Sequence, residues 1–159
     1  MSPFEASTRQ LTVILTLVAL FFVPAASQTT TTLNPHRISL ANGKSFNLNL
    51  PEGFDIAVAA QGLKRVRFMS KSPDNRIFVT DMFNLTDNKR GVVYVLDEFD
   101  PTAKRFKKVT QFMSGLHNPN SVAFYTDKDG TDWFYLALTD RLVRYRYEKE
   151  STKPTGQSQ

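Results

Sequence analysis

The sequence predicts an all-β fold, and three observations support this. After Leu48, apolar and polar residues alternate with a period of two in several short segments, which is the pattern of half-buried strands. The same region has no apolar pattern with the 3.6-residue period of a helix. Turn-forming residues, such as Ser72-Pro73-Asp74-Asn75, separate the segments. We therefore expect short strands joined by tight turns.

The expected strands follow in chain order. In 54–60, Phe54, Ile56 and Val58 alternate with aspartate and alanine, which predicts the first strand. The later segments are rich in β-branched and aromatic residues, which favour strands. They are a short strand after Gly62-Leu63, then 77–80, 92–96, 109–113, 122–125, 133–138 and 142–147.

The order of these segments repeats along the chain. The pairs Gly62-Leu63 and Gly115-Leu116 lie 53 positions apart, and each follows an apolar segment. Each pair precedes a short strand, a polar turn and an aromatic-rich strand, and the copies end at Thr80-Asp81 and Thr139-Asp140. A four-stranded unit that recurs every 40–50 residues is typical of a β-propeller blade. We therefore expect a partial β-propeller of about one and a half blades; the alternative is a β-sandwich of about eight strands.

Composition excludes several classes of protein. Of the 159 residues, 41% are hydrophobic and 22% charged, which is normal for a globular chain. The absence of cysteine excludes a disulfide scaffold, thiolate catalysis and cysteine-ligated metals. The net charge is +5, and the densest basic run is Lys104-Arg105-Phe106-Lys107-Lys108. We interpret this run as a strand edge protected by lysines, and we expect no nucleic-acid partner.

The chain divides into four parts. Residues 1–27 are typical of a secretory signal peptide, with an apolar run from Leu11 to Val23 followed by small residues. This run is shorter than the roughly 20 residues that cross a bilayer, although an uncleaved anchor is the alternative. The threonine-rich stretch 28–47 predicts a linker, 48–149 the partial propeller, and 150–159 a polar tail at which we expect the protein to be truncated. The protein is thus expected to be secreted or periplasmic, without a membrane span after cleavage.

Several segments together resemble one known family. They are Leu50-Pro51-Glu52-Gly53-Phe54, then 91–97, 115–124, 133–137 and 143–147. In this order they resemble the N-terminal part of the soluble glucose/sorbosone dehydrogenase family, a group of six-bladed propellers, and the resemblance covers 48–157. The sequence departs from the family at Lys64-Arg65-Val66-Arg67, where the usual Asn-Pro is missing.

The resemblance implies an exported oxidoreductase that uses pyrroloquinoline quinone (PQQ) and calcium. Hydride would pass from a sugar or polyol to the quinone, with a histidine as base, because such a cofactor carries the redox chemistry. In the family, the base and most of the cations that hold the quinone belong to later blades. We therefore assign no catalytic, cofactor-binding or metal-binding residue to this chain and expect it to be inactive alone. The alternatives are a non-catalytic secreted propeller that binds a protein or carbohydrate, and a propeller hydrolase of lactone-like substrates.

Two local clusters resemble functional sites but have simpler interpretations. Asp127-Lys128-Asp129-Gly130-Thr131-Asp132 could offer oxygen ligands to calcium, yet it lacks the glycine and glutamate of a full calcium loop. We interpret it as a polar hairpin turn. Asp97-Glu98-Phe99-Asp100 contains paired carboxylates, and we interpret it as the end of a strand and the following turn.

Three single residues remain as candidates. His117 lies between Gly115-Leu116 and Asn118-Pro119, where it would either line a substrate opening or be an ordinary loop residue. His36, next to Pro35, is expected at the surface. Asn84-Leu85-Thr86 is an N-glycosylation sequon in the loop between two expected strands, so Asn84 is the modification site to consider.

Overall fold

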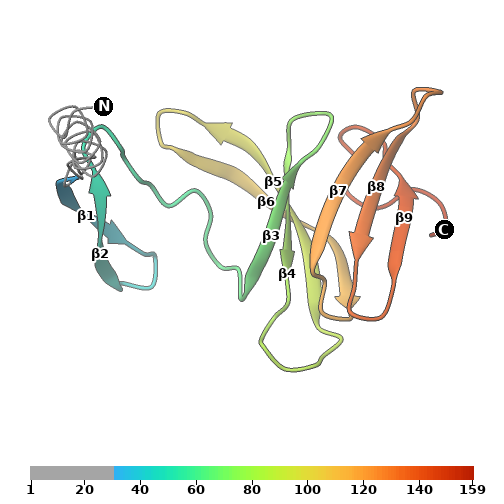
Figure 1. Ribbon diagram of the computed structural model, residues 1–159, viewed down its shortest axis with the longest axis horizontal. Helices are drawn as coiled ribbons and strands as arrows, with labels where there is room; N and C mark the ends of the chain where they lie inside the picture. Colours follow the sequence, from blue (N-terminus) through green and yellow to red (C-terminus); the bar gives the residue numbers. More distant parts are fainter. Residues whose placement is uncertain (1–30) are drawn as a thin grey trace, which may run out of the picture. The chain divides into compact units, whose positions relative to one another are not determined.

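The computed structural model describes residues 31–159, and this part contains strands but no helix (Figure 1). The strands are β1 Leu33–Ser39, β2 Ser45–Pro51, β3 Val66–Lys71, β4 Ile77–Asp81, β5 Gly91–Asp100, β6 Arg105–Leu116, β7 Ser121–Thr126, β8 Asp132–Ala137 and β9 Leu142–Arg146. They form three antiparallel sheets, β1-β2, β3-β4-β5-β6 and β7-β8-β9, and none of these closes on itself. The prediction of an all-β fold is confirmed. The expected signal peptide, 1–27, lies outside the described residues.

No helix in residues 31–159 is long and apolar enough to cross a membrane.

In the four-stranded sheet, each strand pairs with its neighbour in the sequence. β4 pairs with β5 from Ile77 opposite Leu96 to Asp81 opposite Val92, in an unbroken antiparallel register. Residues 105–108 of the basic run begin β6, which is an edge strand, as predicted. That the lysines protect this edge stays a prediction. The strand order agrees with the four-stranded unit that the repeat predicts.

The three-stranded sheet is extended by the C-terminal residues. Arg144 of β9 and Gln159 exchange two backbone hydrogen bonds of 3.0 Å each. Arg146 forms a further antiparallel bridge with Thr155. The stretch 150–159, expected to be a plain polar tail, therefore turns back and runs along the edge of β9.

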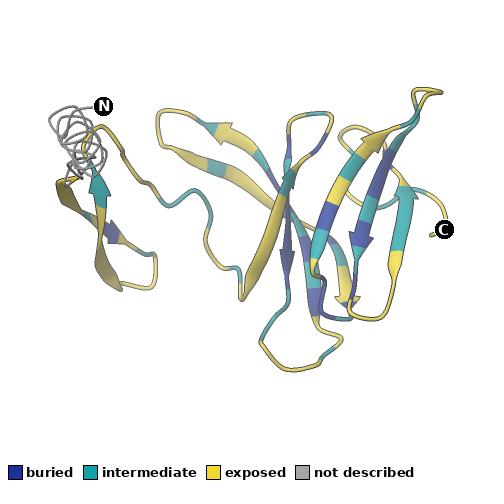
Figure 2. Cartoon of the chain, in the orientation of Figure 1, coloured by how far each residue is buried: buried dark blue, intermediate teal, exposed yellow. Residues whose placement is uncertain are grey.

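One apolar core joins the two larger sheets. Phe78 of β4 and Phe134 of β8 are fully buried, and their ring centroids lie 5.7 Å apart. The other members of this core are Val93, Val95, Phe112, Leu116, Val122, Leu136, Leu138 and Tyr147. In Figure 2, β4 and β8 are the strands coloured most continuously as buried. The two sheets thus pack face to face through the inward half of each alternating pattern.

The predicted strand at 54–60 is wrong. This segment is extended but is not a strand, and Phe54 and Ile56 are 65% and 36% exposed. The amide of Phe106 donates a 2.9 Å hydrogen bond to the carbonyl of Ala59. Alternating apolar and polar residues suit a strand, but a strand forms only where a neighbouring segment supplies a continuous series of backbone hydrogen bonds.

Two other boundaries differ from the expectation. The hairpin of β1 and β2 lies largely within 28–47, where composition predicted a linker, and it buries Ile38. Strand β5 does not end at Asp97 but continues to Asp100, where it pairs with Arg105. The following turn lies at 101–104. Both differences involve polar residues that alternation did not identify as paired.

Gly91, the first residue of β5, is buried beneath the loop that follows β6. A Cβ atom at this position would lie 2.1 Å from Pro119 Cδ and 2.9 Å from the carbonyl oxygen of Leu116. We expect Gly91→Ala to lower the free energy of unfolding by about 1–3 kcal/mol, because such overpacking displaces buried backbone. Urea unfolding followed by the fluorescence of Trp133 would measure it. Pro119→Ala in the same chain should restore part of the loss; equal stability of Gly91→Ala and wild type would contradict the packing.

Candidate functional site

Three connections between strands lie at the same end of the two larger sheets. They are the β4–β5 loop (82–90), the β6–β7 connection (117–120) and the β8–β9 turn (138–141), seen along the lower edge of Figure 1. Backbone hydrogen bonds join them: Asn118 N–H donates to Asn88 O, and Thr139 N–H donates to His117 O, both at 3.2 Å. We call these three segments the loop cluster. It brings together polar and titratable side chains from both sheets.

Asp81 lies at the end of β4, where the loop cluster begins, and is 2% exposed. Its carboxylate accepts hydrogen bonds from the amides of Lys64 (2.6 Å), Arg65 (2.8 Å) and Phe83 (2.8 Å). A buried carboxylate needs such partners, and here backbone amides supply them. Asp81 therefore fixes the start of β3 and the start of the loop, and its oxygens are already engaged.

Three asparagines connect the loop to the next sheet. Asn88 Nδ2 lies 2.7 Å from Asn118 Oδ1, and Asn118 Nδ2 lies 3.2 Å from the carbonyl oxygen of Thr86. Asn118 has a φ of 39°, a conformation that asparagine tolerates better than most residues. Asn84 Oδ1 accepts hydrogen bonds from Thr86 Oγ1 and Asn88 Nδ2, both at 2.9 Å. The sequon at Asn84 thus lies in this network, and its glycosylation stays a prediction.

His117 contacts carboxylates from two of the connections. Its Nε2 lies 2.5 Å from Asp87 Oδ1 in the β4–β5 loop, and its Nδ1 lies 3.5 Å from Asp140 Oδ2 in the β8–β9 turn. The imidazole is 18% exposed. The hydrogen bond to Asp87 is the main cause that raises the pKa of His117; partial burial opposes it, and Asp140 adds to it. His117 therefore lies between two carboxylates that favour its protonated form, and neither ring nitrogen is open to a substrate.

Sequence analysis found His117 but not its partners. Asp87 is 30 positions away, in the β4–β5 loop. Asp140 was recognised only as the second residue of a repeated Thr-Asp ending. No local pattern links the three residues, although the two Thr-Asp endings indicated that both loops begin at the same point of the repeat. Nδ1 of His36, the other histidine, lies 3.8 Å from Asp55 Oδ1. His36 belongs to β1 and not to either of the two larger sheets that carry the loop cluster.

The acidic segment 127–132 is a hairpin turn, as predicted. Asp127 Oδ1 accepts the amides of Asp129 (3.0 Å) and Thr131 (2.9 Å), while Oδ2 accepts the indole N–H of Trp133 (2.9 Å). These hydrogen bonds, that of Trp133 above all, lower the pKa of Asp127. Gly130 has a φ of 78°, which suits the tight turn. The carboxylate oxygens of Asp127 therefore serve the turn itself.

The donor set in residues 31–159 does not fit calcium. No three His, Asp or Glu side chains converge on a common point in this part of the chain. Asp87 and Asp140 lie at opposite nitrogens of one ring, so the imidazole separates them. Calcium takes six to eight oxygen ligands, and the oxygens of Asp81 are engaged with amides. The loop cluster is therefore a hydrogen-bonded connection between sheets rather than a cage of free ligands.

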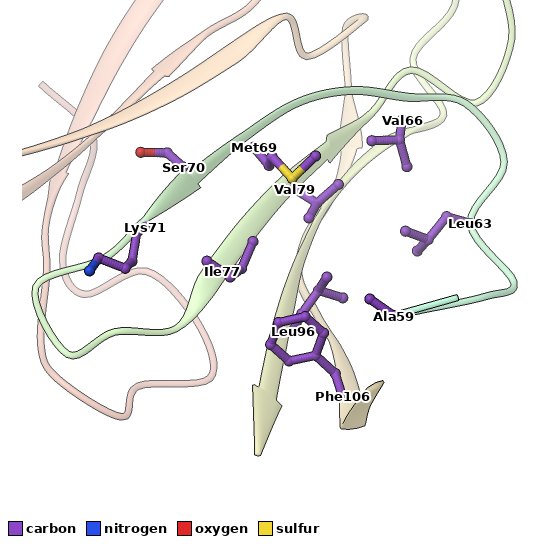
Figure 3. Close-up of a pocket in the computed structure, with 10 residues that line it drawn as sticks. All are labelled: Ala59, Leu63, Val66, Met69, Ser70, Lys71, Ile77, Val79, Leu96 and Phe106. Atoms are coloured by element: carbon purple, nitrogen blue, oxygen red, sulfur yellow. The ribbon is translucent and has the colours of Figure 1, made fainter. Parts of the chain in front are cut away.

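The outer face of the four-stranded sheet carries an apolar groove of about 360 Å³ (Figure 3). Ile77, Val79 and Leu96 line it, and they alternate with the core residues Phe78 and Val95, so the groove lies on the opposite face of the sheet. The other lining residues are Ala59, Leu63, Val66, Met69, Ser70, Lys71 and Phe106. Its one ionisable lining residue is Lys71, so the groove suits the burial of apolar surface better than acid–base chemistry.

Comparisons of the chain with protein-family models, with curated proteins and with solved structures found no match.

Proposed function

We propose that the two larger sheets, residues 66–146 of the expected 48–149, form successive blades of a β-propeller of the glucose/sorbosone dehydrogenase type. The observation that carries this proposal is the repeated arrangement of two sheets. In each of these sheets, neighbouring strands are also consecutive in the sequence. The two sheets pack face to face, and the three connections of the loop cluster meet at one end of them. Blades of a propeller have this organisation, whereas a β-sandwich is usually connected as a Greek key.

The apolar groove supports further blades over the alternative of a small sandwich. A two-layer sandwich keeps its apolar residues between the layers and presents polar residues outside. Here Met69 and Val66 are 63% and 43% exposed on β3, next to the groove. A neighbouring blade would bury these side chains, so we infer that another sheet covers this face in the complete protein.

The proposed activity of the complete ring is the oxidation of a sugar or related alcohol with PQQ and calcium, in an exported protein. Because the donor set in residues 31–159 does not fit calcium, we expect the groups that hold both cofactors to come from other blades. The part played by this chain is then structural: the loop cluster shapes one section of the rim, and the sheets fix its position. No catalytic step is assigned to its residues.

A titration of the secreted protein, as isolated from its source, tests the proposal. We expect PQQ with calcium to quench Trp133 or shift its own absorbance saturably, and we expect sugar-dependent reduction of an artificial electron acceptor. Apo protein without calcium is the control. An isolated product with the full ring that shows neither binding nor reduction would overturn the proposal. An intact mass close to 18.0 kDa would mean that this chain acts alone.

The second candidate is a secreted, non-catalytic propeller that binds a protein or carbohydrate. The observation that favours it is the loop cluster, whose side chains bind one another; residues 31–159 contain no group of three His, Asp or Glu side chains that could hold a metal ion. Saturable binding to an immobilised glycan or extracellular protein, with no response to PQQ, would support this function. Binding of PQQ by the same sample would exclude it.

A further inference from the structure

We propose that His117 is a proton-operated clasp, which holds the β8–β9 turn against the rest of the loop cluster when its imidazole is protonated and releases that turn when the imidazole is neutral. The clasp joins three connections of two sheets through one ring. It is independent of the oxidation proposed above, since it requires only the described residues.

The geometry defines what each ring nitrogen does. Nε2–H donates to Asp87 Oδ1 at 2.5 Å, and Nδ1 lies 3.5 Å from Asp140 Oδ2 without an aligned hydrogen bond. A protonated imidazole has two N–H groups, one for each carboxylate, and its positive charge attracts both. A neutral imidazole has one N–H. The shorter contact keeps it, so the neutral ring presents the lone pair of Nδ1 to Asp140.

Loss of the proton therefore weakens the contact of His117 with Asp140 and leaves its contact with Asp87. Asp140 would face a lone pair instead of a cation, while Arg141 Nη1, 3.1 Å from Asp140 Oδ2, offers the carboxylate another partner. The other charged group that faces the ring is Asp87, which keeps its hydrogen bond. The turn would then be held to His117 by the long Thr139 N–H to His117 O bond of 3.2 Å. We expect 138–141 to open more often and 82–90 to stay in place.

The direction of the pH effect follows from the raised pKa of His117. A group whose pKa is raised on folding stabilises the folded arrangement fully below its ordinary value of 6.5, and this stabilisation is lost as the pH rises through the raised value. The turn is thus closed in mildly acidic solution and more open in alkaline solution.

Two measurements on the whole folded chain test the clasp. NMR titration of His117 should show a midpoint above the ordinary value of 6.5. Hydrogen exchange, corrected for the intrinsic effect of pH, should become about 1.5- to fivefold faster in 138–142 as the pH rises past that midpoint, the range expected for loss of one exposed ionic contact. Exchange in 82–90 should change much less.

Variants separate the clasp from a purely structural role. Asp140→Asn should lower the midpoint of His117 and make the corrected exchange in 138–142 independent of pH. His117→Gln, if that variant folds, should also make this exchange independent of pH. Asp129→Asn, which removes an exposed carboxylate from the β7–β8 turn, is the matched control and should leave both readouts unchanged. A midpoint of His117 at or below 6.5, or exchange in 138–142 with the same pH dependence in wild type and Asp140→Asn, would overturn the proposal.

Discussion

Phe78→Ala should lower the free energy of unfolding by about 3–5 kcal/mol, the usual loss when a buried phenylalanine is truncated. Phe78 is fully buried where the two larger sheets meet. Its ring lies 4.9 Å from those of Phe112 and Phe124 and 5.7 Å from those of Phe134 and Tyr147, mostly edge to face. Alanine would leave a cavity lined by four aromatic rings from both sheets, and edge-to-face pairs add to the loss.

Urea unfolding followed by Trp133, the single tryptophan, is a direct measurement. Phe99→Ala is the matched control, because Phe99 also lies in the four-stranded sheet but is 52% exposed and contacts Phe106 in its own hairpin. Its loss should be below about 1.5 kcal/mol. If the two variants were equally stable, the face-to-face packing of the sheets would be refuted.

Arg76→Met should also be strongly destabilising, by about 3–5 kcal/mol, because it leaves a buried carboxylate without its charge partner. The side chains of Arg76 and Asp74, in the turn between β3 and β4, are 7% and 10% exposed, and their Nε–Oδ2 distance is 3.0 Å. Arg76 also donates to the hydroxyl of Tyr147 (2.7 Å) and to the carbonyl of Ser151 (3.0 Å). This network thus connects the four-stranded sheet to the residues that follow β9.

The double variant Asp74→Leu/Arg76→Met separates two causes of the expected loss of stability in Arg76→Met. One is the lost attraction between the two side chains, and the other is the charge of Asp74 left without a partner. Removing both charges should restore part of the stability, since a buried pair is replaced by apolar groups. Arg144→Met is a control of the same type on β9, where Arg144 stacks on Trp133 at 4.2 Å near the surface. An Arg76→Met variant with wild-type stability would show that the network does not contribute.

The same network predicts how stability depends on pH. Burial opposes ionisation of Asp74, but hydrogen bonds from Ser72, Tyr147 and the amide of Glu150, with the charge of Arg76, lower its pKa to about 2. Its contribution is complete above the ordinary value of 3.8 and is lost as the pH falls through about 2. Burial and the hydrogen bond to Asp74 raise the pKa of Tyr147 to about 12, so its contribution is complete below 10 and is lost towards 12. Between pH 2 and 5, the urea concentration at the unfolding midpoint should rise steeply with pH for wild type and less steeply for Asp74→Asn.

The elements predicted well from the sequence are those whose partners are neighbours in the chain. β4, β7, β8 and β9 were expected within one residue of their observed bounds, and each pairs with a strand that is adjacent to it in the sequence. The segment 54–60 has an alternating pattern, but no adjacent segment pairs with it along its length. Alternation therefore predicts which side chains suit a sheet and does not reveal whether a partner is present.

The candidate site was harder to predict because its contacts join distant residues. His117 and Asp87 of the loop cluster are 30 positions apart. Outside that cluster, Arg76 and Tyr147 are 71 positions apart, and Tyr147 was expected only as the last residue of a strand. Thr80 donates from β4 to the carbonyl of Asn120, 40 positions away, which no repeat or motif suggests. Such contacts depend on how one sheet lies on the next, and that arrangement is decided by the shape of the aromatic core rather than by a local pattern.

The order of the strands also has a consequence for synthesis. All strands of the four-stranded sheet are complete at Leu116, and β4, β5 and β6 can each pair with the strand made just before it. The partner for the inner face of this sheet, Phe134 on β8, is translated 18 residues after Leu116. On a growing chain the four-stranded sheet can therefore form first, with Phe78 and Phe112 exposed to water until β8 is made. During that interval the nascent protein presents an apolar surface that a chaperone would recognise, and release would follow the arrival of β8.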